Sequence, residues 1–126
     1  CIGETIEQLN NGLAKETVSA QLNEGLCGLS SLKNIVIAYE PVWAIGTGLT
    51  ASVDKVAEIH LLIRNMLSGI SIKENGNLIP ILYGGSVNSD NAEELIGVNN
   101  VNGFLIGGAS LDVEKFVDII NIVDQK

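Results

Sequence analysis

One carboxylate in this sequence stands where a strand is expected to end and a glycine-rich loop to begin. Glu40 follows the apolar run at residues 35–39 and precedes Pro41, with Gly46 and Gly48 a little further on. Proline fixes its own φ and keeps the preceding residue extended, so the backbone of Glu40 is restrained. A flap hinged on glycines could close over the side chain. Excluding water destabilises a charged carboxylate and makes it a stronger base toward a carbon-bound proton. The pattern therefore predicts that Glu40 is a catalytic base, although a lone Glu at a strand end is more often a solvated surface residue.

Two later stretches place a glycine pair directly after an apolar run. Gly84 and Gly85 follow the first run, at residues 79–83, and Gly107 and Gly108 follow the second, at residues 103–106. Such glycines let backbone N–H groups approach an anion, and the start of a helix adds a partial positive charge. A single glycine pair more often marks a tight turn. Two pairs in order after Glu40 favour an anion-binding edge.

Three stretches of the sequence match motifs of one enzyme family. Residues 39–48 read Tyr-Glu-Pro-Val-Trp-Ala-Ile-Gly-Thr-Gly, residues 83–87 read Tyr-Gly-Gly-Ser-Val, and residues 103–110 read Gly-Phe-Leu-Ile-Gly-Gly-Ala-Ser. Together they resemble the triosephosphate isomerase family. Residues 1–5 resemble the end of the fifth strand of that family. The resemblance implies an α/β fold, the C-terminal half of a (β/α)8 TIM barrel. A single partial domain would span residues 1–126, from the fifth strand end through the eighth helix. A complete barrel of this kind has about 250 residues, so the N-terminal half is expected to be absent from this chain.

The resemblance also implies a reaction and roles for individual residues. The reaction is the interconversion of dihydroxyacetone phosphate and D-glyceraldehyde 3-phosphate, a step of glycolysis and gluconeogenesis, through an enediol, with Glu40 as the base. The residues implied to hold the substrate phosphate are Gly46, Ser86, Gly107 and Gly108. Those implied to form the hinges and latch of the lid are Trp43, Gly48, Ala51, Tyr83 and Ser86.

A whole active site of this family needs groups that the sequence does not carry. The resemblance places an Asn and a Lys on the first strand and a His on the fourth, in the missing half. His60 is no substitute, because it lies on the apolar stripe of a helix expected at 53–67, where a packing or interface residue is typical. The basic residues sit in helical patterns or before a strand, so none is expected to replace the missing Lys: Lys15, Lys33, Lys55, Arg64 and Lys115.

These gaps leave a second interpretation open, in which the chain is a catalytically incomplete, phosphate-binding or structural half-barrel. Half a barrel exposes strand edges and an apolar interior, so it should aggregate, pair with its missing N-terminal half or pair with itself. The resemblance implies that the parent enzyme is a homodimer, with contacts largely in the absent half.

Composition limits the other partners. The net charge is −8 and hydrophobic residues make up 46% of the chain. These values disfavour nucleic acid and, with no apolar stretch long enough to cross a bilayer, a membrane. A cytoplasmic domain without metal or cofactor is expected. Cys1 and Cys27 are expected to be reduced, and the alternative of a lipoprotein beginning at Cys1 lacks a polar tether. The absence of an initiator Met suggests a fragment or a processed product.

Alternating apolar segments and helical patterns predict parallel strands joined by right-handed crossovers. Strands are expected at 35–39 and 78–82 and after Asn100, and helices at 17–29, at 53–67, up to Ile96 and at the C-terminus. Residues 75–77 predict a turn, and Pro80 conflicts with a central strand. Asp90 with Glu93 suggests a helix cap. The last helix is expected to face inward with Val113, Phe116, Val117 and Ile120.

Overall fold

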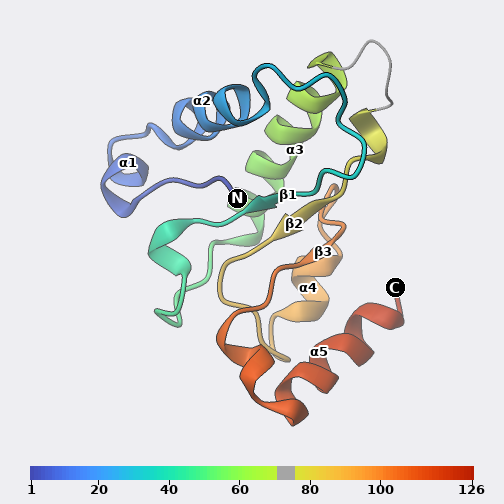
Figure 1. Ribbon diagram of the computed structural model, residues 1–126. Helices are drawn as coiled ribbons and strands as arrows, with labels where there is room; N and C mark the ends of the chain where they lie inside the picture. Colours follow the sequence, from blue (N-terminus) through green and yellow to red (C-terminus); the bar gives the residue numbers. More distant parts are fainter. Residues whose placement is uncertain (71–75) are drawn as a thin grey trace.

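The computed structural model describes residues 1–70 and 76–126, and a parallel sheet lies at its centre (Figure 1). β1 (Ile37–Tyr39), β2 (Ile81–Tyr83) and β3 (Gly103–Phe104) pair in that order, with Ala38 opposite Leu82 and Leu82 opposite Gly103. Ile2 forms an isolated parallel bridge with Tyr39, so the first residues lie beside β1 as a fourth extended segment. The predicted parallel strands with helical crossovers are confirmed.

Helices lie between the strands along the chain. They are α1 (Ile6–Asn10), α2 (Ala14–Leu26), α3 (Val53–Ile70), α4 (Ala92–Ile96) and α5 (Val113–Asp124), with short 3₁₀ turns η1 (Val42–Ala44), η2 (Gly76–Leu78) and η3 (Gly108–Leu111). In Figure 1, α3 and α4 lie behind the sheet, and no helix of the described residues covers the near face. The chain thus forms an α/β half-shell whose concave side is open.

The core lies between the sheet and its helices. Successive side chains of a strand point to opposite faces, and Tyr39, Ile81 and Tyr83 point toward the helices and are fully buried. They pack with apolar residues of α2 and α3: Val18, Leu22, Val56, Ile59, Ile63 and Leu67. Ala38 and Leu82 alternate with these residues and lie outside the core cluster, which places them on the open face.

The expectation for the last helix is wrong. Val113, Phe116, Val117 and Ile120 are 78%, 36%, 44% and 47% exposed, whereas Ile119 is buried. The physical reason is the position of α5 at the end of the sheet: it packs mainly against α4 and η3, and β3 has no further strand beside it in the described residues. The apolar stripe is present in the sequence but lacks a surface to cover.

Local chemistry moves several other boundaries. β2 begins after Pro80, whose carbonyl accepts the N–H of Ile37 at 3.0 Å, so the proline precedes the strand and the predicted conflict disappears. Helix α2 begins at Ala14 and ends at Leu26, earlier than predicted.

The short helix α1 was not predicted, although Thr5 and Gln8 form a capping box at its start. Asp90 is not the cap of α4: Asn91 occupies that position, and the Oδ1 of Asn88 accepts the N–H groups of Asp90 and Asn91. Of the predicted turn at 75–77, residue 75 lies outside the described residues, and η2 begins at Gly76.

Candidate functional site

Glu40 directly follows β1, and hydrogen bonds fix the backbone around it on both sides. Its N–H donates to the carbonyl of Ile2 at 2.8 Å, and the preceding carbonyl, that of Tyr39, accepts the N–H of Gly84 at 2.8 Å. The side chain is half-buried and lies over the Cα of Gly84, because a Cβ added there would stand 2.5 Å from Cγ and 3.0 Å from Oε1 of Glu40. The carboxylate is therefore positioned by its own strand and by a glycine on the next.

The loop after Glu40 is a short turn followed by an exposed tip. η1 contains Trp43, and residues 45–50 are all exposed. Gly46 and Gly48 have φ values of 66° and 77°, in the left-handed region that glycine adopts readily. Inside the tip, the Thr47 hydroxyl donates to the Trp43 carbonyl at 3.0 Å and accepts the N–H of Leu49 at 3.2 Å. The tip is thus folded on itself and free to meet a ligand.

Both ends of this loop are tied to the segment after β2. The Ser86 hydroxyl donates to the carbonyl of Ala44 at 2.7 Å, and the N–H of Ala51 donates to the Tyr83 hydroxyl at 3.2 Å. The Thr50 hydroxyl adds a bond to the carbonyl of Ser86 at 3.3 Å. The structure thus brings Tyr83, Ser86 and Ala51 together, while Gly48, the third residue of the predicted latch, lies in the exposed tip.

A second carboxylate, Glu4, holds the near end of the loop and was missed by the sequence reasoning. It is fully buried and accepts the indole N–H of Trp43 at 2.9 Å and the hydroxyl of Tyr39 at 3.2 Å. Burial, and then the charge of Glu4, raise the pKa of the Tyr39 phenol, so it stays a proton donor. The position of Glu4 at the end of an extended segment, like that of Glu40 after β1, could be read from the sequence, but its bonds to Tyr39 and Trp43 could not.

The two glycine pairs differ in structure. Gly84 and Gly85 are buried, and a Cβ on either would collide with the chain itself, with Glu40 in the first case and with the Tyr83 hydroxyl in the second. Gly107 and Gly108 are exposed, with no heavy atom within 4 Å of an added Cβ. The first pair makes room for neighbouring side chains, and only the second, at the start of η3, presents open backbone to a ligand.

His60 and Arg64 lie on α3, away from Glu40, and both are buried. His60 Nδ1 lies 3.0 Å from the carbonyl of Asn100, which fixes the proton on Nδ1, and its ring meets Tyr39 edge to face. Burial lowers the pKa of His60. This confirms its expected role as a packing residue. Arg64 donates to the carbonyls of Gly76 and Ile79 at 2.7 and 2.8 Å, at the opposite end of the strands from Glu40.

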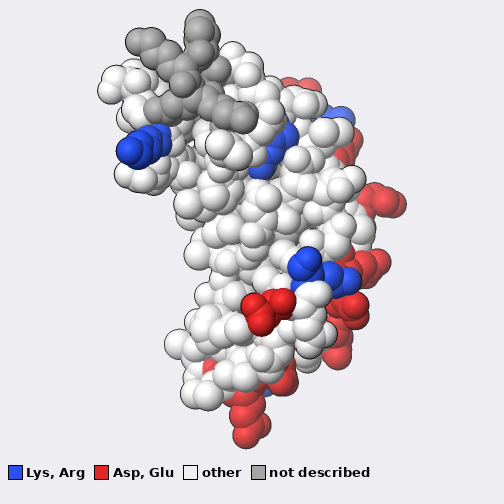
Figure 2. All heavy atoms as spheres, turned by 90° about the vertical axis from the view of Figure 1, so that its right-hand side faces the viewer, with Lys and Arg blue, Asp and Glu red and all other residues white. Residues whose placement is uncertain are grey.

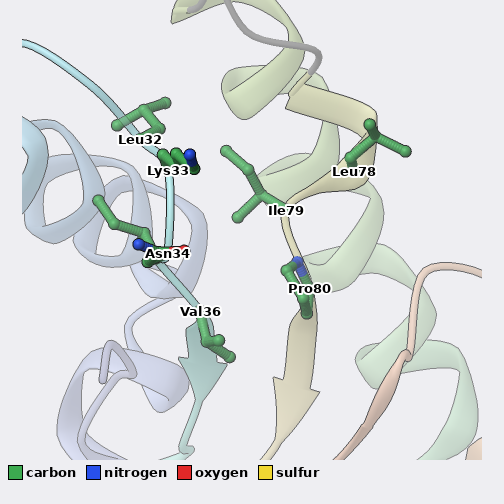
Figure 3. A pocket seen from close by; sticks show the side chains of 8 residues that line it. Leu32, Lys33, Asn34, Val36, Leu78, Ile79 and Pro80 are labelled. Atoms are coloured by element: carbon green, nitrogen blue, oxygen red, sulfur yellow. The ribbon is translucent and has the colours of Figure 1, made fainter.

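The pocket of Figure 3 also lies at that opposite end. It has a volume of about 490 Å³ and is lined by the segments that precede β1 and β2: Leu32, Lys33, Asn34, Ile35, Val36, Leu78, Ile79 and Pro80. In Figure 3, Ile79 points toward the segment with Leu32 and Lys33, and Leu78 points away. None of the predicted site residues lines this pocket.

Metal-binding groups do not cluster around Glu40. Within residues 1–70 and 76–126, no three His, Cys, Asp or Glu side chains come close enough together to hold a metal ion. The helices of the same residues include none that could span a membrane. The polar groups that gather at the C-terminal ends of the strands are the carboxylates of Glu40 and Glu4, hydroxyls and backbone amides.

Fold and site together define part of a (β/α)8 barrel with a strand-end carboxylate beside a tethered loop, an arrangement typical of barrel enzymes. The model of the triosephosphate isomerase family matches residues 1–123. The chain belongs to the triosephosphate isomerase family.

Individual relatives agree. Triosephosphate isomerases of Chlorobium phaeobacteroides and Chlamydia caviae are 52% and 51% identical over 120 residues, covering 95% of this chain and 48% and 47% of theirs. The crystal structure of triosephosphate isomerase from Bartonella henselae superposes with a TM-score of 0.86 at 37% identity, covering 100% of this chain and 49% of that one. The predicted fold class is confirmed, and the chain spans about half the length of the curated relatives it matches.

Proposed function

We propose that this chain supplies the base and the phosphate-binding edge of a triosephosphate isomerase, the remaining groups coming from an N-terminal half. The observation that supports this most strongly is the position of the Glu40 side chain, which lies against Gly84 at the C-terminal edge of the sheet. The loop that follows Glu40 is bonded at its ends to Tyr83 and Ser86. Barrel enzymes of this kind carry out their chemistry at that edge.

In the proposed reaction, Glu40 removes a proton from the carbon next to the substrate carbonyl and returns it to the neighbouring carbon of the enediol. The phosphate is held by backbone N–H groups of Gly46, Ser86, Gly107 and Gly108. Uncharged amides at short turns and helix starts suit this role in an acidic chain, because they attract an anion without a basic side chain.

The loop over the site is proposed to act as a lid. Trp43 and Ala51 would be its hinges, and Tyr83, Ser86 and Gly48 its latch. The bonds of Ala51, Ser86 and Thr50 fix the two ends of the loop, and the exposed residues 45–49 between them would cover bound substrate. Closure would exclude water from Glu40 and strengthen it as a base.

The isolated chain is proposed to be inactive. The groups expected to polarise the substrate carbonyl lie in the N-terminal half, and the loss of one acid or base partner typically slows a reaction about 10²–10⁴-fold. The parent complex would be a cytoplasmic, glycolytic homodimer with triose phosphate as its substrate and without a cofactor.

A complementation assay tests this proposal. The purified chain is mixed with the half of the Chlorobium phaeobacteroides relative that precedes the matched region, and isomerase activity is followed with a coupled assay. Turnover is expected only for the mixture, and Glu40→Asp and Glu40→Gln should reduce it by about 10²-fold or more. Glu16→Gln, at an exposed Glu of α2, is the matched control and should leave turnover unchanged.

Association of the halves without turnover would contradict the catalytic proposal. It would leave a phosphate-binding or structural half-barrel, the second function considered from the sequence.

A further inference from the structure

Asn91 contacts two segments on which the proposed function depends. It is half-buried and lies at the start of α4. Its side-chain Nδ2 donates to the carbonyl of Ser86 at 3.1 Å and to the Thr50 hydroxyl at 3.3 Å. Thr50 stands at the far end of the lid, next to the hinge Ala51, and Ser86 is one of the residues assigned to the phosphate. One amide therefore bonds to the lid and to the phosphate-binding segment at the same time.

The orientation of the Asn91 amide is fixed by its other partner. Its Oδ1 accepts the N–H of Asn88 at 2.9 Å, and the Oδ1 of Asn88 accepts the N–H of Asn91 at 3.2 Å. The two residues, three positions apart, thus bond reciprocally as in a capping box. Because an amide has one acceptor oxygen and one donor nitrogen, this pairing turns the nitrogen of Asn91 toward Ser86.

Ser86 is held by two of its three polar groups. Its hydroxyl donates to the carbonyl of Ala44 at 2.7 Å, at the near end of the lid. Its carbonyl accepts Nδ2 of Asn91 at 3.1 Å and the hydroxyl of Thr50 at 3.3 Å. The third group is the backbone N–H that is proposed to bind the phosphate. With the other two groups bonded, the backbone of Ser86 has little freedom to turn, so the direction of this N–H is set before substrate arrives.

The direction of each N–H is important because the chain offers a phosphate little positive charge. Acidic side chains are widespread on the face seen in Figure 2, and the net charge is −8. Binding then depends on hydrogen bonds from neutral amides, which weaken steeply once the angle at the hydrogen falls below about 120°. A residue that fixes the backbone of Ser86 therefore affects the affinity for the anion.

We propose that Asn91 is a positioning residue for the substrate phosphate. It holds the carbonyl of Ser86 so that the Ser86 N–H points at the phosphate, and it ties Thr50 at the end of the lid to the same carbonyl. The inference rests on the proposed function, in which Ser86 binds the phosphate. Asn91 itself does not touch the substrate. Losing its donor weakens phosphate binding in the ground state and in the transition state alike, so KM rises while kcat changes little.

Asn91→Asp tests the proposal, because it keeps an oxygen for the N–H of Asn88 and removes only the donor. The variant is mixed with the N-terminal half used in the complementation assay. KM should rise about tenfold, the loss expected for one hydrogen bond to a charged group, with kcat nearly unchanged. The dissociation constant of inorganic phosphate, measured on the same mixture by phosphorus NMR, should rise by a similar factor. Urea unfolding should show a chain as stable as the unsubstituted one.

Two controls separate positioning from helix capping and from charge. Asn88→Ala removes the acceptor of the N–H groups of Asp90 and Asn91 but leaves the Asn91 donor in place. It should lower the midpoint of urea unfolding and leave KM unchanged. Ser89→Asp adds the same charge as Asn91→Asp at an exposed position of the same segment. Because solvent screens an exposed charge, KM should change less than about twofold.

The outcomes distinguish this inference from the proposed function. If folded Asn91→Asp left KM and the phosphate dissociation constant unchanged, the inference would be wrong. It would also be wrong if Ser89→Asp or Asn88→Ala raised KM equally, since charge or the start of α4 would then be the cause. If the unsubstituted mixture bound phosphate without turnover, the catalytic function would fail, and the phosphate dissociation constants alone would decide the role of Asn91. Associated halves that bound no phosphate would overturn both.

Discussion

Glu4 joins a fixed strand to a loop through one side chain. Its carboxylate accepts hydrogen bonds from Trp43 and Tyr39. Glu4→Ala leaves the buried Tyr39 hydroxyl and the half-buried Trp43 N–H without an acceptor and removes packed atoms, so it should lower the free energy of unfolding by about 3 kcal/mol. Glu4→Gln keeps one acceptor oxygen and should cost about 1 kcal/mol. Urea unfolding measures both values, and the emission of Trp43, the only tryptophan, reports the loosened loop.

Glu7→Gln is the control for this pair, because Glu7 is an exposed residue of α1. If Glu4→Ala cost no more than Glu7→Gln, the buried bonds would contribute nothing measurable to stability.

His60 makes stability depend on pH. The neutral ring is buried, Nδ1 faces the Asn100 carbonyl, and Nε2 has no hydrogen-bond partner within the described structure. Burial and, to a lesser extent, the charge of Arg64 lower its pKa in the folded state. As the pH falls, the His60 ring of the unfolded chain therefore binds a proton at a higher pH than the ring of the folded chain. Stability is complete above the ordinary His pKa of about 6.5 and falls as the pH drops from there toward the lowered folded pKa.

Unfolding free energies measured between about pH 7 and pH 5 check this prediction. His60→Asn keeps a donor toward Asn100 and should flatten the slope. Glu58 and Asp112 have lowered pKa values and titrate at more acidic pH, so they do not produce the same change. If the free energy of unfolding of His60→Asn changed with pH as steeply as that of the unsubstituted chain, the pH dependence would come from another group.

At this scale the sequence predicted Glu40 and the lid residues but not Glu4. Glu40 is followed by proline and glycines, which leave a local signal in the chain. The partners of Glu4 are 35 and 39 positions away, and no local pattern reports a contact at that distance. For the same reason, the sequence did not predict that Gly84 makes room for the Glu40 side chain, because the two residues meet only in the folded chain.

The contact between Glu40, directly after β1, and Gly84, directly after β2, gives a prediction at the scale of elements. Gly84→Ala would place a methyl group 2.5 Å from Glu40 Cγ, and overpacking of this kind costs about 1–3 kcal/mol. Removing the Glu40 side chain relieves the clash, so Gly84→Ala should cost less in a Glu40→Ala background. A double-mutant cycle by urea unfolding measures the difference.

Gly108→Ala is the matched control, since open space surrounds that position. If Gly84→Ala lowered the free energy of unfolding equally with and without the Glu40 side chain, the two residues would not be in steric conflict.

Arg64 connects α3 with the starts of β2 and β3. Its guanidinium is buried and donates to Asn102 Oδ1 at 2.9 Å, and that oxygen also accepts the N–H of Ile81 at 2.9 Å. Asn102→Asp keeps both acceptor contacts and gives the cation a negative partner. The substitution should raise the free energy of unfolding by about 1 kcal/mol. Thermal unfolding measures the gain.

Asn99→Asp, at an exposed position of the same loop, is the control and should not stabilise the chain, which already carries a net charge of −8. A loss of stability in Asn102→Asp would mean that the new carboxylate loses more by desolvation than it gains from Arg64.

The order and type of the main elements could be predicted from the sequence because apolar runs and helical stripes are local patterns. The inward face of α5 could not. Its stripe Val113, Phe116, Val117 and Ile120 has the spacing of a buried face, but burial needs a neighbour, and within residues 1–70 and 76–126 no strand pairs with β3 on its outer side. The periodicity of apolar residues predicts which face of a helix can be buried, and contacts with other elements determine whether that face is buried.

The whole chain carries charges mostly on its helices and almost none on the open face of its sheet. The contact with the proposed N-terminal half is therefore expected to be apolar. Val36→Asp would bury a charge in that contact and should weaken the association of the halves about tenfold or more, whereas Leu61→Asp, at an exposed position of α3, should not.

Sedimentation velocity of the mixed halves measures the association, and circular dichroism checks that each variant is folded. If the Val36→Asp and Leu61→Asp chains bound the N-terminal half equally tightly, the open face of the sheet would not be the contact between the halves.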